Sequence, residues 1–313
     1  MNKRAILAGI AIVVIFFWLK GLMSDSSQDQ VASVTTAGDE KIVALSTFTI
    51  LSDMVSEVGG NRVESISLTK PGVGIHQYEP TPSDLVQAAR ANILFENGLN
   101  LELWTEKLRT SIPDMPSVIL SEGVEVKSIS GGVYDGKPNP HAWMSPQKGL
   151  IYIENIRKAL VELSPEDEEY FNANAKAYSE ELLAVDVKLK ESLDKLPENN
   201  RYLVSCEGAF GYLTDDYGLN ELYLWAINDE PGGSPQHIAG IIDTVKENKI
   251  PAVFCESTVE PLIQMEVAEA SGAKLGNTLF VDSLSDKDGP APTYLTLLQS
   301  TAESIISGLS GEK

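Results

Sequence analysis

Basic residues are scarce in this sequence. Its 313 residues contain 24 Lys and Arg against 45 Asp and Glu, which gives a formal net charge of −21. A nucleic-acid partner requires basic patches, and an anionic membrane surface would repel so acidic a chain. Because the acidic residues are scattered along the chain, we interpret most of them as a solvated surface. We therefore expect no nucleic-acid partner.

Long apolar runs are also scarce, and the run at the N-terminus is short. Residues 5–19 carry no charge and follow Lys3 and Arg4, a pattern typical of an export signal. This run is shorter than the ~20 residues that a transmembrane helix needs, although its extension to residue 23 would allow an anchor. No cysteine lies near its end, which predicts that the chain is not a lipoprotein. We interpret residues 1–23 as a signal peptide or membrane anchor of a periplasmic or other extracytoplasmic protein.

Only two cysteines are present, Cys206 and Cys255. Each ends an apolar run and is followed by a glutamate. Export would permit a disulfide between them, whereas the alternative is two small buried residues at strand ends. The sequence positions leave both possibilities open.

Short apolar runs alternate with helical patterns on both sides of one long helical segment. This alternation predicts an α/β fold with two lobes and mostly parallel sheets. The expected strands are residues 41–47, 63–69, 92–98, 117–123, 201–208, 221–227, 251–257 and 277–284. The expected helices are residues 49–58, 82–91, 100–111, 146–163, 235–248, 258–272 and 291–309.

A single long helix is expected between the two lobes. Residues 165–196 contain no internal proline or glycine after Pro165, and apolar side chains recur there at steps of three to four residues. Such a helix would be roughly 48 Å long and stiff, so we expect little closure between the lobes. The predicted organisation is a linker at 24–40, an N-terminal lobe at 41–163, a connecting helix at 164–197 and a C-terminal lobe at 198–313.

Histidine is rarer than any other candidate metal ligand except cysteine, with three in the chain. His76 lies in "GVGIHQYEPTPSD" and His141 in "GKPNPHAWMSP", and both segments are bounded by proline or glycine. Such loops can bring side chains to a cleft, although a lone loop histidine commonly bonds only its neighbours. His237, in "SPQHIAGI", lies at the start of an expected helix, and we assign it no role in metal binding.

The C-terminal lobe offers carboxylates at corresponding places. Glu207 ends the expected strand "RYLVSCE", and Asp282 follows "TLFV". Together with the two loop histidines they would form a mixed nitrogen and oxygen ligand set across a cleft. Spacing alone does not establish that the four side chains meet.

Six segments together resemble, in order and spacing, the motifs of the metal-binding solute-binding proteins of ABC importers. The resemblance is to the long-helix class, above all to its manganese-binding members, and covers about residues 41–309. It implies one divalent ion bound between the lobes by His76, His141, Glu207 and Asp282. The six segments are "HQYEPTPSD", "NPHAWMSP", "CEGAFGYLTDDYGL", "GGSPQHI", "FCEST" and "LFVDSLS".

The resemblance also bears on the identity of the metal. Zinc-carrying members tend to place a third histidine where this chain has Glu207, and to insert a His- and acid-rich loop that is missing after His76. Oxygen ligands suit Mn²⁺ or Fe²⁺, which accept more ligands than tetrahedral Zn²⁺. We therefore expect a monomeric solute-binding protein that carries Mn²⁺, or alternatively Fe²⁺ or Zn²⁺, to a membrane permease.

The same resemblance implies a disulfide between Cys206 and Cys255. Because Cys206 adjoins Glu207, the bond is either a static link between strands or a redox switch of metal affinity. Nearby, we expect Trp143 to pack under His141, Glu79 to be a surface or helix-entry carboxylate, and Glu256 to support the site without binding the ion.

Two functions of other classes, a metal-dependent hydrolase and a surface adhesin, are alternatives to transport. A metal-dependent hydrolase would use similar ligands, but it needs an open coordination position and a general base, and no H-E-x-x-H signature occurs in the sequence. A surface adhesin could be built on the same scaffold. The expected protein is not an enzyme.

Overall fold

The computed structural model describes residues 41–228 and 233–310, which belong to one compact unit beginning at Lys41. The expected signal or anchor at 1–23 and linker at 24–40 lie outside the described residues. None of the helices in the described ranges has the length and apolar character needed to cross a membrane. Below, residues 41–163 are called the N-terminal half and residues 198–310 the C-terminal half.

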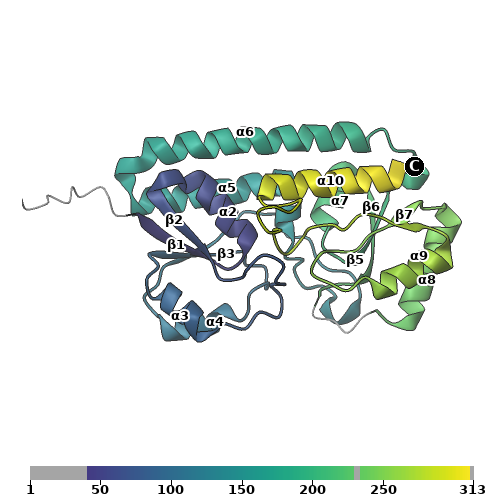
Figure 1. Cartoon of the computed structure of the whole chain (residues 1–313), viewed down its shortest axis with the longest axis horizontal. Coiled ribbons are helices and arrows are strands. Elements are labelled where there is room, and N and C mark those ends of the chain that lie inside the picture. Colours follow the sequence, from purple (N-terminus) through teal and green to yellow (C-terminus); the bar gives the residue numbers. More distant parts are fainter. Residues whose placement is uncertain (1–40, 229–232, 311–313) are drawn as a thin grey trace, which may run out of the picture. The chain divides into compact units, whose positions relative to one another are not determined.

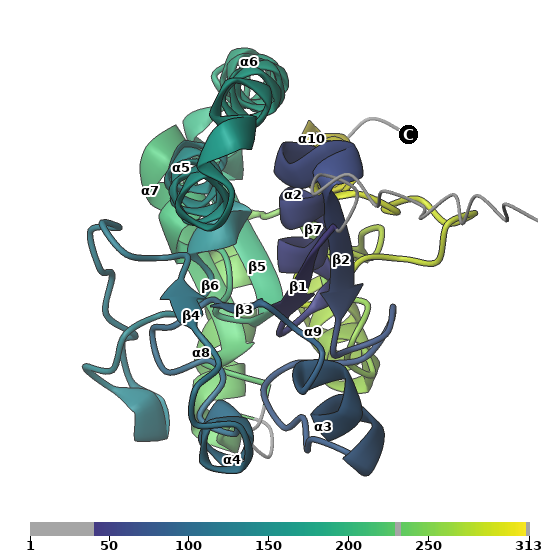
Figure 2. The same cartoon turned by 90° about the vertical axis from the view of Figure 1, so that its left-hand side faces the viewer.

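The N-terminal half contains one four-stranded parallel sheet, with its strands in the order β2-β1-β3-β4 (Figure 2). Ala44, Leu45 and Phe95 on the two inner strands are completely buried, which explains why these strands are almost entirely apolar. The strands are β1 (Ile42–Ser46), β2 (Val63–Ser67), β3 (Ile93–Glu96) and β4 (Ser117–Ile119). The helices are α2 (Thr49–Gly59), α3 (Pro82–Ala88), α4 (Thr105–Ser111) and α5 (Pro146–Leu163).

Local sequence signals explain where two of these helices begin. Thr81 and Asp84 form a capping box at the start of α3 with Pro82 in its first turn. In contrast, α4 begins five residues later than predicted. Leu99 and Asn100 have φ values of 53° and 67°, so the chain cannot be helical there.

The long helix α6 (Glu168–Leu193) has 26 residues and lies along α5, α2 and α10 (Figure 1). Its first predicted turn, Pro165–Asp167, is instead a separate 3₁₀ turn in which the Ser164 hydroxyl bonds the Asp167 carboxylate at 3.0 Å. The buried face agrees with the predicted periodicity. It consists of Phe171, Ala175, Tyr178, Leu182, Val185, Leu189 and Leu193.

The strands of the C-terminal half form two separate parallel pairs. The pairs are β5 (Tyr202–Glu207) with β6 (Asn220–Trp225), and β7 (Ala252–Val253) with β8 (Lys274–Leu275). The helices are α7 (Gly211–Tyr217), α8 (Pro235–Asn248), α9 (Leu262–Ser271) and α10 (Tyr294–Ser310). The sequence did not predict α7, because its glycines indicated only a turn, and α9 begins after Pro261 rather than at residue 258.

The strand predicted at 277–284 is wrong. Within the described chain this segment contributes only an isolated parallel bridge between Leu279 and Glu256. The backbone carbonyls that follow this bridge accept hydrogen bonds from side chains. Phe280 O accepts from Thr301 at 3.3 Å, and Val281 O accepts from Trp143 at 2.9 Å. Side-chain donors thus replace a ladder, and Asp282 follows irregular backbone instead of a strand end.

Candidate metal centre

His76 lies on the loop between β2 and α3, and aromatic side chains hold this loop. The indole Nε1 of Trp104 donates to the carbonyl of Ile75 at 3.2 Å. Tyr78 packs edge-on against the Trp104 ring, with the centroids 5.0 Å apart. The residues on both sides of His76 are therefore fixed by contacts with α4 and its preceding turn.

His141 is held more tightly, and its tautomer follows from its neighbour. The Nδ1 atom lies 2.9 Å from Asn139 Oδ1, an oxygen that only accepts, so Nδ1 carries the hydrogen. Asn139 Nδ2 in turn donates to Gly208 O at 2.7 Å, which fixes the orientation of this amide. The lone pair of His141 Nε2 is consequently free to bind a cation.

Trp143 packs against the same imidazole, as expected. Its ring stands edge-on to His141 with the centroids 5.1 Å apart, and it contacts Phe48 of the N-terminal half at 5.0 Å. Both Trp143 and His141 are completely buried. The position of the imidazole is thus determined by packing as well as by Asn139.

The structure brings all four predicted residues together. Glu207 ends β5 and Asp282 lies in the segment after the bridge at Leu279, and both carboxylates are completely buried. One ligand atom from each of the four side chains lies within 4.8 Å of the others. These atoms are His76 Nε2, His141 Nε2, Glu207 Oε1 and Asp282 Oδ1.

Distances around this point suit the first ligand sphere of a single ion. His76 Nε2 lies 3.2 Å from His141 Nε2, 3.1 Å from Glu207 Oε1 and 3.7 Å from Asp282 Oδ1. The Asp282 Oδ1 atom is buried and accepts no hydrogen bond. Leaving a buried carboxylate oxygen without a donor is costly, so a cation at this point would satisfy it.

The electrostatics favour positive charge at the same place. Burial alone would lower the pKa of His76, but the charges of Glu207 and Asp282 outweigh it and hold this pKa well above its usual range. For Glu207, burial would raise the pKa, whereas the imidazoles of His141 and His76 lower it far below the ordinary value. The two carboxylates thus favour a positive charge at the place where a divalent ion would bind.

Three residues at the site were not predicted to act there. Asn228 contacts both carboxylates, and Thr258 donates to Asp282 Oδ2 at 3.3 Å. Asn139 orients His141, and its place two residues before that histidine in "NPHAWMSP" was the available signal. The sequence carries no comparable signal for Asn228, because its partners Glu207 and Asp282 lie 21 and 54 positions away along the chain.

A cavity of about 330 Å³ leads to the site, lined among others by Val73, His76, Asn228, Thr258 and Asp282. His76 keeps 6% of its side chain exposed, while the other three ligand residues are fully buried. An ion would therefore meet His76 first on entering by this route.

Two other predictions about nearby residues agree with the structure. The Glu79 side chain is 85% exposed, lies 3.9 Å from Lys107 and does not belong to the group of four ligand residues. His237 bonds the carbonyl of Tyr223 through Nε2 at 2.8 Å and does not belong to the site.

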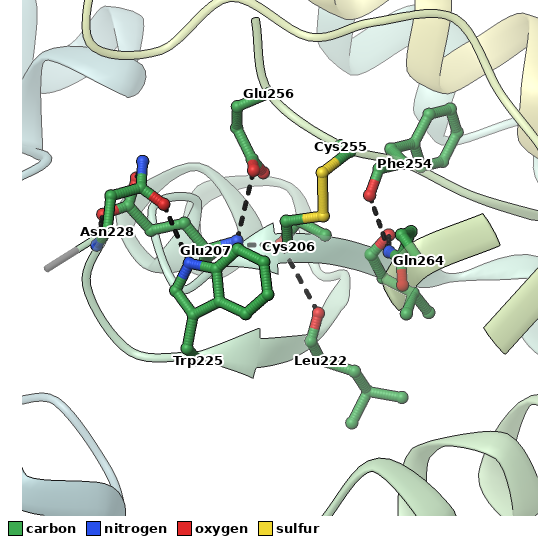
Figure 3. Close-up of a disulfide and its surroundings, with 11 residues drawn as sticks. Cys206, Glu207, Leu222, Trp225, Asn228, Phe254, Cys255, Glu256 and Gln264 are labelled. Atoms are coloured by element: carbon green, nitrogen blue, oxygen red, sulfur yellow. Dashed lines mark hydrogen bonds between the residues drawn. A yellow bond between two sulfur atoms is a disulfide. The ribbon is translucent and has the colours of Figure 1, made fainter. Parts of the chain in front are cut away.

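The Cys206–Cys255 disulfide is present, and it joins β5 to the segment that follows β7 (Figure 3). Beyond it, buried Glu256 accepts the backbone N–H of Glu207 at 3.2 Å. Burial and the charge of Glu207 raise the pKa of Glu256 well above its usual range. Glu256 thus supports Glu207 from behind, as expected.

The parallel sheets, the single long helix and a buried site of two imidazoles and two carboxylates define a class of metal-binding substrate-binding proteins. Residues 44–308 match the family model described as "Zinc-uptake complex component A periplasmic", and the chain belongs to this family of metal ABC-transporter binding proteins. Relatives of the family bind Mn, Zn or Fe.

Individual relatives extend over most of the chain. It is 48% identical over 269 residues to the iron-binding protein YfeA of Yersinia pestis, covering 86% of each chain. It is 30% identical to the manganese ABC transporter substrate-binding lipoprotein PsaA of Streptococcus pneumoniae, covering 99% of this chain and 100% of that one. A Mn-bound periplasmic metal-binding protein from Candidatus Liberibacter asiaticus superimposes with a TM-score of 0.79 at 35% identity, over 86% and 100% of the two chains.

The prediction that the chain is not a lipoprotein is contradicted by these relatives. PsaA and two further streptococcal relatives are named substrate-binding lipoproteins. The prediction rested only on the absence of cysteine near residues 5–19, which lie outside the described ranges. That absence does not decide how a member of this family is held, and the prediction is withdrawn.

Proposed function

We propose that this protein binds one divalent transition-metal ion with His76, His141, Glu207 and Asp282 and delivers it to the permease of an ABC importer. The observation that carries the proposal is the meeting of four ligand atoms within 4.8 Å at a buried point. The tautomer of His141 and the unpartnered oxygen of Asp282 support it, because both leave lone pairs directed to that point.

Manganese is the cargo that we favour, with ferrous iron and zinc as alternatives. Two carboxylates supply hard oxygen ligands, which suit Mn²⁺ and Fe²⁺. Intrinsic affinities nevertheless follow the order in which Zn²⁺ exceeds both Fe²⁺ and Mn²⁺ at most such sites. The choice of metal therefore depends on coordination geometry and on the metals available where the protein works.

The proposed role is binding and release without turnover. Family membership supports a transport function over an enzymatic one. A single chain supplies the whole ligand set, so the protein is proposed to act as a monomer in complex with its permease.

The decisive experiment is metal analysis of the protein purified from its native source, followed by titration of the metal-free protein with MnCl₂, FeCl₂ and ZnCl₂. The proposal expects Mn²⁺ in the native protein and one equivalent bound per chain. A stoichiometry of one ion per two chains, or no binding to the metal-free protein, would contradict it. If the native protein contains zinc or iron, the proposed transport role stands and that metal replaces Mn²⁺ as the proposed cargo.

A further inference from the structure

One amide, that of Asn228, holds both carboxylates of the site by their outer oxygens. Its Nδ2 atom donates to Glu207 Oε2 at 2.8 Å and to Asp282 Oδ2 at 3.0 Å. The backbone N–H of Asn228 also donates to Glu207 Oε1 at 2.8 Å. Both hydrogens of the amide nitrogen are thus used by the two residues that supply oxygen to the ion.

The orientation of this amide is fixed by a second contact. Trp225 Nε1 donates to Asn228 Oδ1 at 2.8 Å, as Figure 3 shows. An indole N–H is only a donor, so it selects the oxygen of the amide and turns Nδ2 toward the carboxylates. Trp225 ends β6 beside Glu207, its partner in the parallel ladder, and therefore places the amide from within the sheet.

These contacts divide each carboxylate into an inner and an outer oxygen. Glu207 Oε1 and Asp282 Oδ1 lie toward the imidazoles, while Glu207 Oε2 and Asp282 Oδ2 are bound by Asn228. Each carboxylate then offers one oxygen, which gives four protein ligands in total. Each outer oxygen keeps a second lone pair, but turning either carboxylate so that both of its oxygens reach the ion would bend or lengthen its bond to Asn228 Nδ2.

Coordination number is the property in which the candidate metals differ. Zn²⁺ is satisfied by four ligands in a tetrahedron, whereas Mn²⁺ prefers six and gains from carboxylates that bind through both oxygens. We infer that Asn228 is a specificity-determining residue, which keeps both carboxylates monodentate and so favours Zn²⁺ relative to Mn²⁺. This inference rests on the proposed function and concerns the choice among its candidate metals.

The test is to compare the affinities for Zn²⁺ and Mn²⁺ of the wild type and the Asn228→Ala variant. The backbone N–H to Glu207 survives this substitution, and only the amide is lost. We expect the ratio of Zn²⁺ to Mn²⁺ affinity to fall by about tenfold, at the lower end of the range measured for partners of metal ligands. A ratio that stays within about twofold of the wild type, or that rises, would overturn the inference.

Two further variants separate the amide's role from general damage to the site. Trp225→Phe removes the contact that orients the amide and should lower the same ratio by a smaller factor. Thr258→Val also removes a donor to Asp282 Oδ2, but it touches only one of the two carboxylates and leaves Asn228 in place, so it should lower the ratio less than Asn228→Ala does. An equal fall in Thr258→Val and Asn228→Ala would show that no special role belongs to the amide.

X-ray absorption spectroscopy of the Mn²⁺-loaded proteins gives a readout independent of affinity. The number of oxygen neighbours contributed by carboxylate should be higher in Asn228→Ala than in the wild type, and identical spectra would overturn the inference. Wild-type protein that binds neither metal would instead refute the proposed function. Thermal unfolding of the metal-free variants verifies that each is folded before titration.

Discussion

The two halves of the molecule support their ligands in different ways. In the N-terminal half, a continuous ladder joins four parallel strands, and both imidazoles lie on loops beyond it. In the C-terminal half the strands form two separate pairs; Glu207 adjoins the disulfide at Cys206, and Asp282 follows the bridge at Leu279. The comparison shows that the imidazoles depend on their loop neighbours, whereas the carboxylates depend on a few links between distant segments.

Those links in the C-terminal half are specific and few. The disulfide joins Cys206 to Cys255, and one backbone bond runs from Phe254 N to Val204 O at 2.7 Å. Buried Gln264 donates to the same Val204 carbonyl at 3.2 Å. It also donates to Phe254 O at 2.6 Å (Figure 3). Together these contacts take the place of a continuous ladder between β5 and β7.

Removing an imidazole from the N-terminal half should have the largest effect. His141→Ala deletes a buried ligand, so we expect metal affinity to fall by more than the ~10–100-fold typical of an indirect partner. Calorimetric titration of the metal-free protein measures this change. His237→Ala is the matched control. The imidazole of His237 bonds the Tyr223 carbonyl and does not belong to the group of ligand residues, so this substitution should leave metal affinity unchanged. Equal affinity of His141→Ala and wild type would refute the ligand role.

Removing the covalent link should affect the stability of the C-terminal half. The disulfide closes a loop with a sequence separation of 49, for which chain entropy predicts about 4 kcal/mol and engineered cases typically 2–4. We expect the double variant Cys206→Ala/Cys255→Ala to lose about 3 kcal/mol of unfolding free energy in urea, without metal. Reductant should reproduce the loss in the wild type and leave the variant unchanged. An unaltered midpoint would show that the other links suffice.

A loop neighbour in the N-terminal half should matter for binding more than for folding. Asn139→Ala removes the acceptor that fixes the His141 tautomer, and we expect metal affinity to fall by about tenfold. Asn155→Ala is a suitable control, since that amide also bonds two carbonyls of this half, Leu120 O and Glu122 O, away from the ligands. A similar affinity loss in both variants would mean that the effect is general.

A carboxylate that joins the halves should make stability depend on pH. Asp53 of α2 accepts the N–H of Tyr294 at the start of α10. Burial raises the pKa of Asp53 from 3.8 to about 6; the bond from Tyr294 opposes this rise, and the charge of Glu57 adds to it. The folded protein thus holds this proton more tightly than the unfolded chain. Folding becomes less favourable as pH rises from about 4 to about 6, and the effect is constant above that range.

Asp53→Asn keeps an acceptor for Tyr294 and removes the titration. The unfolding free energy of this variant, relative to wild type, should increase by about 1 kcal/mol or more between pH 4 and 7. Urea unfolding with a chelator present measures it, and Asp114→Asn, at an exposed position, provides the baseline. A difference that does not change with pH would contradict the assignment.

The four candidate ligands were selected by the resemblance to metal-binding solute-binding proteins, and the structure brings them together. The sequence also predicted the buried face of α6, because the spacing of three to four residues between apolar side chains determines which face is buried. The segment 277–284 was predicted as a strand from its apolar pattern alone. Its partners are the side chains of Trp143 and Thr301, and local sequence contains no information about such distant donors.

Asn228 shows the same limit at the site. An asparagine in a loop indicates only a turn. Its role arises because Trp225 fixes the amide and two carboxylates from other segments meet it, and neither condition is visible in the sequence around it.

The long helix α6 acts as a strut that couples the halves mechanically. Asp186, in the C-terminal third of this helix, accepts from Gln147 of α5 at 2.6 Å and from Tyr217 of α7 at 2.6 Å, so one carboxylate bonds side chains of both halves. Bending at this point would break both contacts and expose the apolar face of a helix about 39 Å long. Loading should therefore leave the radius of gyration in small-angle scattering unchanged, because this helix opposes a change in the angle between the halves.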